Sequence, residues 1–150
     1  LQAASGDWWR RVGTRFNDQV RIPIGERENP ARITAHDWLP DDGSDHSVPW
    51  NHDMVRRDPA VNGTWAIEVA EAGGYEFELR QWDRGAGKKL DAVAAWVKAG
   101  AAEAKADVAA GAESVTLRLD LPAGPARLQT GLRPAKGKER GAFFVYVKKL

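Results

Sequence analysis

Each of the three histidines of this chain stands next to an aspartate. The pairs are His36–Asp37, Asp45–His46 and His52–Asp53. A carboxylate that orients an imidazole is the arrangement of a general base or of a supported metal ligand. No two histidines lie at the i and i+4 spacing of helical metal sites. The pairs therefore fit two hypotheses, an independent enzyme or metal site and a polar loop in which neighbouring side chains diverge.

Carboxylates that could bind calcium are concentrated in the same stretch, at Asp37, Asp41, Asp42 and Asp45. Their spacing matches no EF-hand loop, and a solvated acidic loop accounts for them without a metal. The chain has no cysteine and no Gly-x-Ser-x-Gly motif, which excludes thiol chemistry and the serine nucleophile elbow. We expect no catalytic residue, metal site or cofactor in this chain.

Seven tryptophans are the most unusual feature of the composition. Three of them fall at the ends of expected strands or in loops, namely Trp38, Trp50 and Trp82. An indole in such a place can stack on a sugar ring, with polar partners drawn from Asp37, Asn51, His52 and Arg80. Indoles also close the ends of a β-sandwich, so structural packing remains the alternative.

The elements that must position these residues begin with a short amphipathic helix over 5–17. Its apolar stripe has helical spacing, at Trp8, Val12 and Phe16, with Trp9 beside it. A capping side chain is expected at Ser5 or Asp7. Because an exposed aromatic stripe usually marks an interface, we expect these four residues to contact something outside the sandwich.

The period then changes to two, which is typical of strands. We expect an edge strand over 20–24, because Pro23 cannot donate to a ladder, and another strand over 32–39. Residues 40–63 have loop composition. A β-hairpin is predicted over 65–82, with Trp65 on its core face and Gly73–Gly74 in its turn.

The second half of the chain is less uniform. Residues 85–113 combine helical spacing with alanine-rich alternation, and we expect a short helix or irregular turn followed by a strand. The pattern assigns no role to Trp96 in this stretch. Strands follow over 115–121 and 126–133, and a central strand over 142–147, because that run is apolar on both faces.

Seven or eight short strands separated by Gly/Pro turns predict an antiparallel, jelly-roll-like β-sandwich with a short N-terminal helix. We expect a helical linker and contact segment over 1–19 and the sandwich over 20–150. The net charge is +1, which gives no basic surface for nucleic acid. No apolar run approaches the ~20 residues that span a bilayer, so neither nucleic acid nor a membrane is an expected partner.

An ordered set of segments resembles the region after the catalytic domain in bacterial arylsulfatases of the alkaline-phosphatase-like family. The segments are Glu28–Trp38 (ENPARITAHDW), Pro49–His52 (PWNH), Asn62–Val69 with Gly74–Trp82, and Leu128–Thr130 with Gly141–Val147. The Trp8–Trp9 segment is similar to the stretch that connects the two domains in those enzymes. The resemblance covers nearly the whole chain except residues 86–112.

The resemblance implies a non-catalytic C-terminal β-sandwich that packs on a sulfatase domain of the same polypeptide. Those enzymes use a formylglycine in a Cys/Ser-x-Pro-x-Arg motif and a nearby calcium, and this chain lacks the motif. The nucleophile and the calcium would then belong to the parent protein, which would be periplasmic or secreted. The chain starts at Leu1 rather than Met, so we expect a fragment. The alternative function is a carbohydrate-binding module that binds polysaccharide through Trp38, Trp50 and Trp82.

Overall fold

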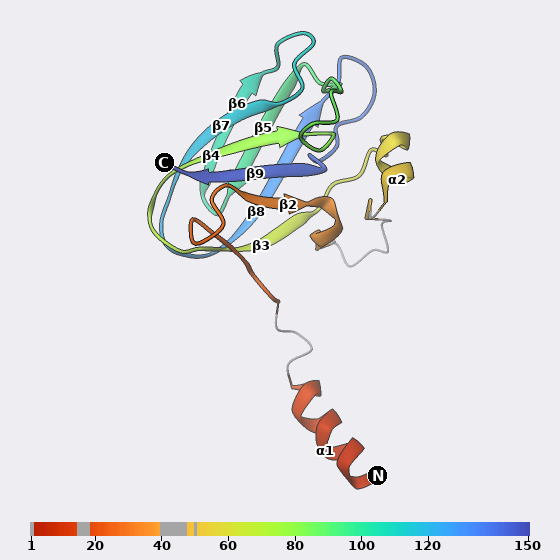
Figure 1. The fold of residues 1–150 in the computed structure, drawn as a ribbon, viewed down its shortest axis with the longest axis vertical. Helices are drawn as coiled ribbons and strands as arrows, with labels where there is room; N and C mark the ends of the chain where they lie inside the picture. The colour runs from red at the N-terminus through yellow and green to blue at the C-terminus, as the bar shows by residue number, and fades with distance from the viewer. Residues whose placement is uncertain (1, 15–18, 40–47, 50) are drawn as a thin grey trace.

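The computed structural model describes residues 2–14, 19–39, 48–49 and 51–150, with side chains from residue 5 onward. Two β-sheets pack face to face (Figure 1). Sheet A has the order β1 (Ile22–Ile24), β3 (Thr64–Val69), β8 (Gly124–Arg133), β5 (Ala94–Ala99) and β6 (Ala102–Asp107). Sheet B has the order β2 (Ala31–Thr34), β9 (Phe144–Lys149), β4 (Gly73–Arg80) and β7 (Val115–Leu121).

The strand order is that of a jelly roll. From β2 onward, successive strands alternate between sheet B and sheet A, except that β5 and β6 form a hairpin within sheet A. All pairs are antiparallel apart from β1, which pairs in parallel with β3. The predicted β-sandwich is confirmed. Pro23 lies in β1 at the edge of sheet A, and β9 lies between β2 and β4 in sheet B, so both positional predictions are also confirmed.

The core lies between the sheets and is filled by one face of each strand. Along β3 these residues are Trp65, Ile67 and Val69, and along β4 they are Tyr75, Phe77 and Leu79, all at 0–2% exposure. Trp65 also donates its indole N–H to the Thr34 carbonyl at 2.7 Å. The prediction that Trp65 is a core residue is confirmed.

The predicted hairpin over 65–82 is wrong, because β3 and β4 belong to different sheets. The connection at 70–72 crosses from sheet A to sheet B, and Gly73 at φ +150° lies at the start of β4. Two alternating strands with a short connection can bury their apolar faces side by side or across the core from each other. Here the second arrangement holds, and β9 and β7 are the neighbours of β4.

Three other predicted elements differ from the structure. In the stretch 85–113 the expected strand is present as β6, but residues 94–99 form a further strand, β5, instead of a helix or irregular turn, because Ala95, Val97 and Ala99 are buried with a period of two. The two strands make a hairpin around Gly100 at φ +58°. The strand expected over 32–39 stops at Thr34, and a single 3-10 turn, η1 (Ala35–Asp37), follows it. Part of the expected loop is α2 (His52–Arg57).

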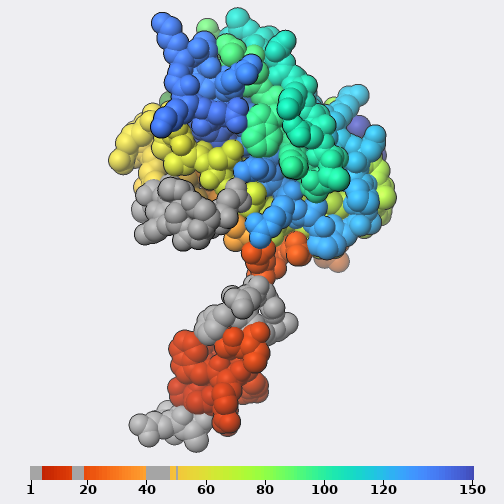
Figure 2. Space-filling model, turned by 180° about the vertical axis from the view of Figure 1, so that it is seen from behind, coloured from red at the N-terminus to blue at the C-terminus, as the bar shows by residue number. Residues whose placement is uncertain are grey.

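Helix α1 spans Gln2–Gly13 and lies outside the two sheets (Figures 1 and 2). It begins before both predicted caps, Ser5 and Asp7, which are therefore interior residues. Asp7 instead forms an ion pair with Arg10 one turn later. No residue of α1 with a described side chain belongs to the core between the sheets.

Helix α2 is fixed at both ends. Asn51 caps its N-terminus by accepting the Met54 amide on Oδ1 at 2.9 Å. Asp58 ends it in the left-handed region at φ +47° and forms an ion pair with Arg140, whose side chain is 2% exposed. Arg140 Nη2 also donates to Gln81 Oε1 at 2.9 Å. Burial raises the pKa of Asp58, and the Arg140 charge opposes that rise.

Candidate functional site

Trp38 does not lie on the surface. It is 5% exposed, and its ring meets Trp65 at 5.5 Å and Phe143 at 6.0 Å between centroids, both edge to face. Gly63 and Gly141 leave room for it, since a Cβ at either position would lie within 2.7 Å of the indole or its Cβ. The expectation that Trp38 stacks on a ligand is therefore wrong for this structure, and the packing alternative holds.

Arg80 is also unavailable to a ligand, because its guanidinium is buried among partners. It donates to Glu78 at 2.7 Å, to Glu113 at 3.1 Å and to the Trp82 carbonyl at 3.1 Å, and its side chain is 7% exposed. Arg84 binds the other oxygen of Glu78. The sequence prediction placed a ligand-binding residue here, whereas the structure gives Arg80 an ion-pairing role.

The neighbouring positions of sheet B extend this ion pairing into a charged network. Arg32 Nη2 binds Asp83 at 2.7 Å, Tyr146 donates its hydroxyl to Asp83, and Arg84 lies 3.9 Å above the Tyr146 ring. Burial raises the pKa of Asp83, but hydrogen bonds from Arg32 and Tyr146 outweigh burial, so the pKa lies below its ordinary value. Burial and the bond to Asp83 raise the pKa of Tyr146.

Trp82 lies just after β4, where it packs partly buried against the core. The ammonium of Lys88 stands 3.9 Å from its ring centroid. A cation at that distance occupies the face on which a sugar would stack. The structure thus places Trp82 on the surface, but with one face covered.

Three of the polar residues singled out by sequence do come together, in a pocket of about 420 Å³. We call it the histidine pocket; His36, Asn51 and His52 line it beside Arg32, Thr34 and Phe144. Asp37 is exposed, accepts a weak hydrogen bond from Thr34 at 3.5 Å and lies 3.9 Å from His36. Neither Arg80 nor Trp82 lines this pocket.

The histidine pocket offers two imidazoles and one guanidinium that is already paired with Asp83. These groups can donate hydrogen bonds to an acceptor such as a carbonyl or an anion. Within the part of the chain that the structure describes, no three His, Asp or Glu side chains lie close enough to hold a metal ion. Trp50, Asp41, Asp42, Asp45 and His46 lie outside the described residues.

The predicted contact residues of the N-terminal helix lie on its surface. Trp8 is 51% exposed and Trp9 54% exposed, and their rings meet edge to face at 5.1 Å. Val12 is partly exposed on the same helix, and Phe16 lies outside the described residues. None of the described helices is long and apolar enough to cross a membrane.

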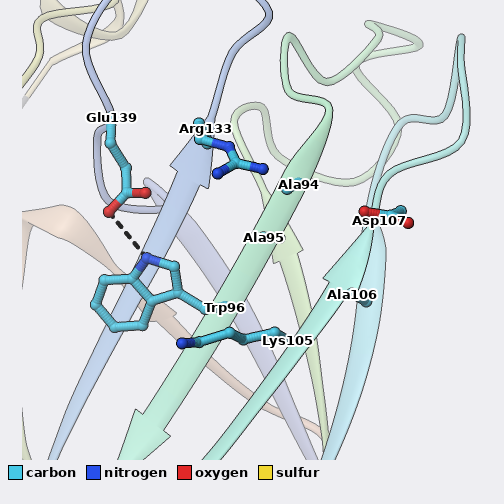
Figure 3. A pocket seen from close by; sticks show the side chains of 8 residues that line it. All are labelled: Ala94, Ala95, Trp96, Lys105, Ala106, Asp107, Arg133 and Glu139. Atoms are coloured by element: carbon cyan, nitrogen blue, oxygen red, sulfur yellow. Dashed lines mark hydrogen bonds between the residues drawn. The ribbon is translucent and has the colours of Figure 1, made fainter.

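Sequence reasoning assigned no role to Trp96, which is partly exposed on the sandwich. Trp96 lies on the outer face of sheet A, in a depression of about 480 Å³ (Figure 3). We call it the Trp96 depression; Lys105, Asp107, Arg133 and Glu139 line it together with small alanine side chains. The sequence did contain a signal, because Trp96 is an aromatic residue in an alanine-rich stretch. Its place on a sheet face could be predicted only once residues 94–99 were assigned to a strand, and the alanines favoured a helix there instead.

No family model matches the chain, and no curated protein matches it at a significant level. Among solved structures, the chain is similar in fold to the crystal structure of a ruminal GH26 endo-beta-1,4-mannanase, with a TM-score of 0.50 and 15% identity. The similarity covers 82% of this chain and 26% of the mannanase chain, so this chain spans about a quarter of that enzyme's length. At this identity the likeness shows the β-sandwich fold alone.

Proposed function

We propose that this chain is a non-catalytic β-sandwich accessory domain that packs, through α1, on a sulfatase catalytic domain of the same polypeptide. The observation that supports it best is the exposure of two adjacent tryptophans on a helix outside the sandwich. The arylsulfatase resemblance of the sequence identifies the partner. In that case the parent protein, which would hydrolyse sulfate esters, holds the nucleophile and the calcium.

Helix α1 needs a surface to pack on. A 12-residue helix is marginal by itself in water, and α1 contains Gly6 and Gly13, which lower its propensity further. Burying the exposed half of two indoles would remove on the order of 200 Å² of surface from water, or about 5 kcal/mol at ~25 cal/mol/Å². That gain is large enough to order the helix against a partner domain.

The first test is the reading frame upstream of Leu1. We expect it to encode a Cys/Ser-x-Pro-x-Arg motif within a sulfatase domain. Its absence would end the sulfatase assignment.

The second test uses the two-domain protein. We expect Trp8→Ala/Trp9→Ala to lower the unfolding temperature of the catalytic domain and to expose the linker to limited proteolysis. Val93→Ala is the matched control, since Val93 is 44% exposed on the sandwich. A double variant that behaves like this control would contradict packing through α1.

A further inference from the structure

The indole of Trp96 lies flat on the backbone of a neighbouring strand. Trp96 on β5 pairs with Gly131 on β8 and with Lys105 on β6. A Cβ at Gly131 would lie 2.0 Å from the indole nitrogen and 2.2 Å from Cε2. A side chain at position 131 would clash with the ring. Glycine is therefore required here so that the indole can lie close to the backbone of β8, and not because the backbone adopts an unusual conformation.

A second contact fixes the rotation of the ring. Trp96 Nε1 donates to Glu139 Oε1 at 2.9 Å, and Glu139 comes from the connection between β8 and β9 (Figure 3). One face of the indole therefore rests on β8, while the view of Figure 3 looks onto the other face. A rigid ring of this kind loses little conformational entropy when a ligand stacks on it.

Two of the polar side chains around the ring have no hydrogen-bond or ion-pair partner among the described residues. Arg133 and Asp107 both stand opposite Ala94 in the strand register, on its two sides. Neither side chain has a hydrogen bond or ion pair to any residue that the structure describes. Because Ala94 is small, the space between the guanidinium and the carboxylate is open.

We propose that the Trp96 depression binds an uncharged pyranose saccharide. The C–H groups on one face of the sugar ring would pack on the indole, and its hydroxyls would bond to Arg133 and Asp107. A hydroxyl both donates and accepts, so the hydroxyls of one sugar ring can bind a cation on one side of Ala94 and an anion on the other.

The charges argue for an uncharged ligand. The depression is lined by two cations, Lys105 and Arg133, and two anions, Asp107 and Glu139. Lys105 is held at 2.8 Å by Glu103, which leaves it partly neutralised. A sulfated ligand would be repelled by the two carboxylates, and a cationic ligand would be repelled by the two basic groups. A net charge on the ligand would therefore not strengthen binding. This proposal stands on sheet A alone and does not rest on packing with a catalytic domain.

The test titrates the complete chain with mannohexaose, cellohexaose and xylohexaose by isothermal calorimetry, and follows the indole N–H signals by NMR. We expect at least one hexasaccharide to bind and to shift the Trp96 N–H signal, which Trp96→Phe identifies by its loss. Trp96→Ala should weaken binding at least tenfold, and Arg133→Ala or Asp107→Ala about three- to tenfold. Trp82→Ala is the matched control and should change the Kd less than twofold.

Several outcomes would overturn the proposal. One is that none of the three probes binds to the wild-type chain. A second is that Trp96→Ala leaves binding unchanged. A third is that, when a chondroitin sulfate hexasaccharide is titrated as a fourth probe, it alone binds, which would show that the ligand is anionic. If Trp96→Ala fails to fold, the Trp96 N–H signal of the wild-type chain decides: a signal that stays in place while saccharide binds places the site elsewhere.

Discussion

The two outer faces of this sandwich carry similar residues and use them differently. On sheet B, arginines, carboxylates and a tyrosine bind one another, and little of their hydrogen-bonding capacity is left over. On sheet A, Arg133 and Asp107 flank an indole without binding to any described residue. A jelly roll needs only one face of each sheet for its core, so the other face is free to become a closed network or a binding surface.

The closed network of sheet B follows from register. Arg32, Tyr146 and Glu78 occupy adjacent strands in one row, and Arg80 follows two residues after Glu78 on the same face of β4. Each cation therefore has a carboxylate within one or two positions. On sheet A the corresponding row is Gly131, Trp96 and Lys105, where an indole replaces the ion pair.

The comparison is tested most strongly by removing one arginine from each face. Arg80→Ala removes a buried guanidinium that binds Glu78 and Glu113, and it leaves the largely buried Glu78 with Arg84 as its remaining cation. We therefore expect a loss of about 3 kcal/mol in the free energy of unfolding. Arg133→Ala removes no hydrogen bond or ion pair to a described residue, and we expect a change within about 0.5 kcal/mol. Urea unfolding of both variants measures the difference. Equal losses would mean that Arg133 also has a structural role.

A pair of glycine substitutions gives the next largest effect. Gly131→Ala places a methyl group inside the Trp96 indole, so we expect a loss of about 2 kcal/mol as the ring moves off the strand. Gly74→Ala in sheet B meets nothing nearer than Leu150 at 3.4 Å and should be neutral or stabilising by about 0.5 kcal/mol.

The cause can be separated with a double variant. In a Trp96→Ala background, Gly131→Ala should lose most of its effect on thermal unfolding, because the clash is gone. A cost that persists without the indole would show that Gly131 is required for another reason.

Sequence reasoning reached the fold class because alternation and turn residues are local signals. It placed Pro23 at a sheet edge and 142–147 in a central strand for the same reason. It failed on the partners of strands: an alternating pattern says which face is buried, but not whether the next strand lies beside it or across the core. The expected hairpin over 65–82 is the clearest case.

The candidate sites were harder to predict than the fold. Trp38 and Trp96 both belong to strand-like stretches of sequence, yet their environments differ. Trp38 is buried in space that Gly63 and Gly141 leave open, whereas Trp96 lies on the outer face of sheet A over Gly131. These glycines are distant in sequence from the indoles that they accommodate, so no local pattern identifies the contact. Arg80 poses the same problem, because its partner Glu113 lies 33 residues away.

The pH dependence of the unfolding free energy should come largely from the carboxylates in the charged network of sheet B. Burial raises the pKa of Glu78, but hydrogen bonds from Arg84 and Arg80 outweigh it, and the pKa lies below its ordinary value of 4.5. A carboxyl with a lowered folded-state pKa contributes stability above its unfolded pKa and loses it as the pH falls through the folded pKa. We therefore expect Glu78→Gln to flatten the decline of the unfolding free energy below about pH 4.5. A decline that stays as steep as in the wild-type chain would place the acid-sensitive group elsewhere.

The smallest expected effect compares two surface tryptophans. Lys88→Ala removes the cation above Trp82 and should cost about 0.5 kcal/mol in thermal unfolding. It also uncovers one face of an indole that follows β4 of sheet B, away from Arg133 and Asp107, which flank Trp96 on sheet A. If ring stacking needs those polar partners, the variant gains no affinity for the hexasaccharides that the Trp96 depression binds. A gain would mean that an open indole is sufficient, and the contrast between the two faces would then reduce to which ring is covered.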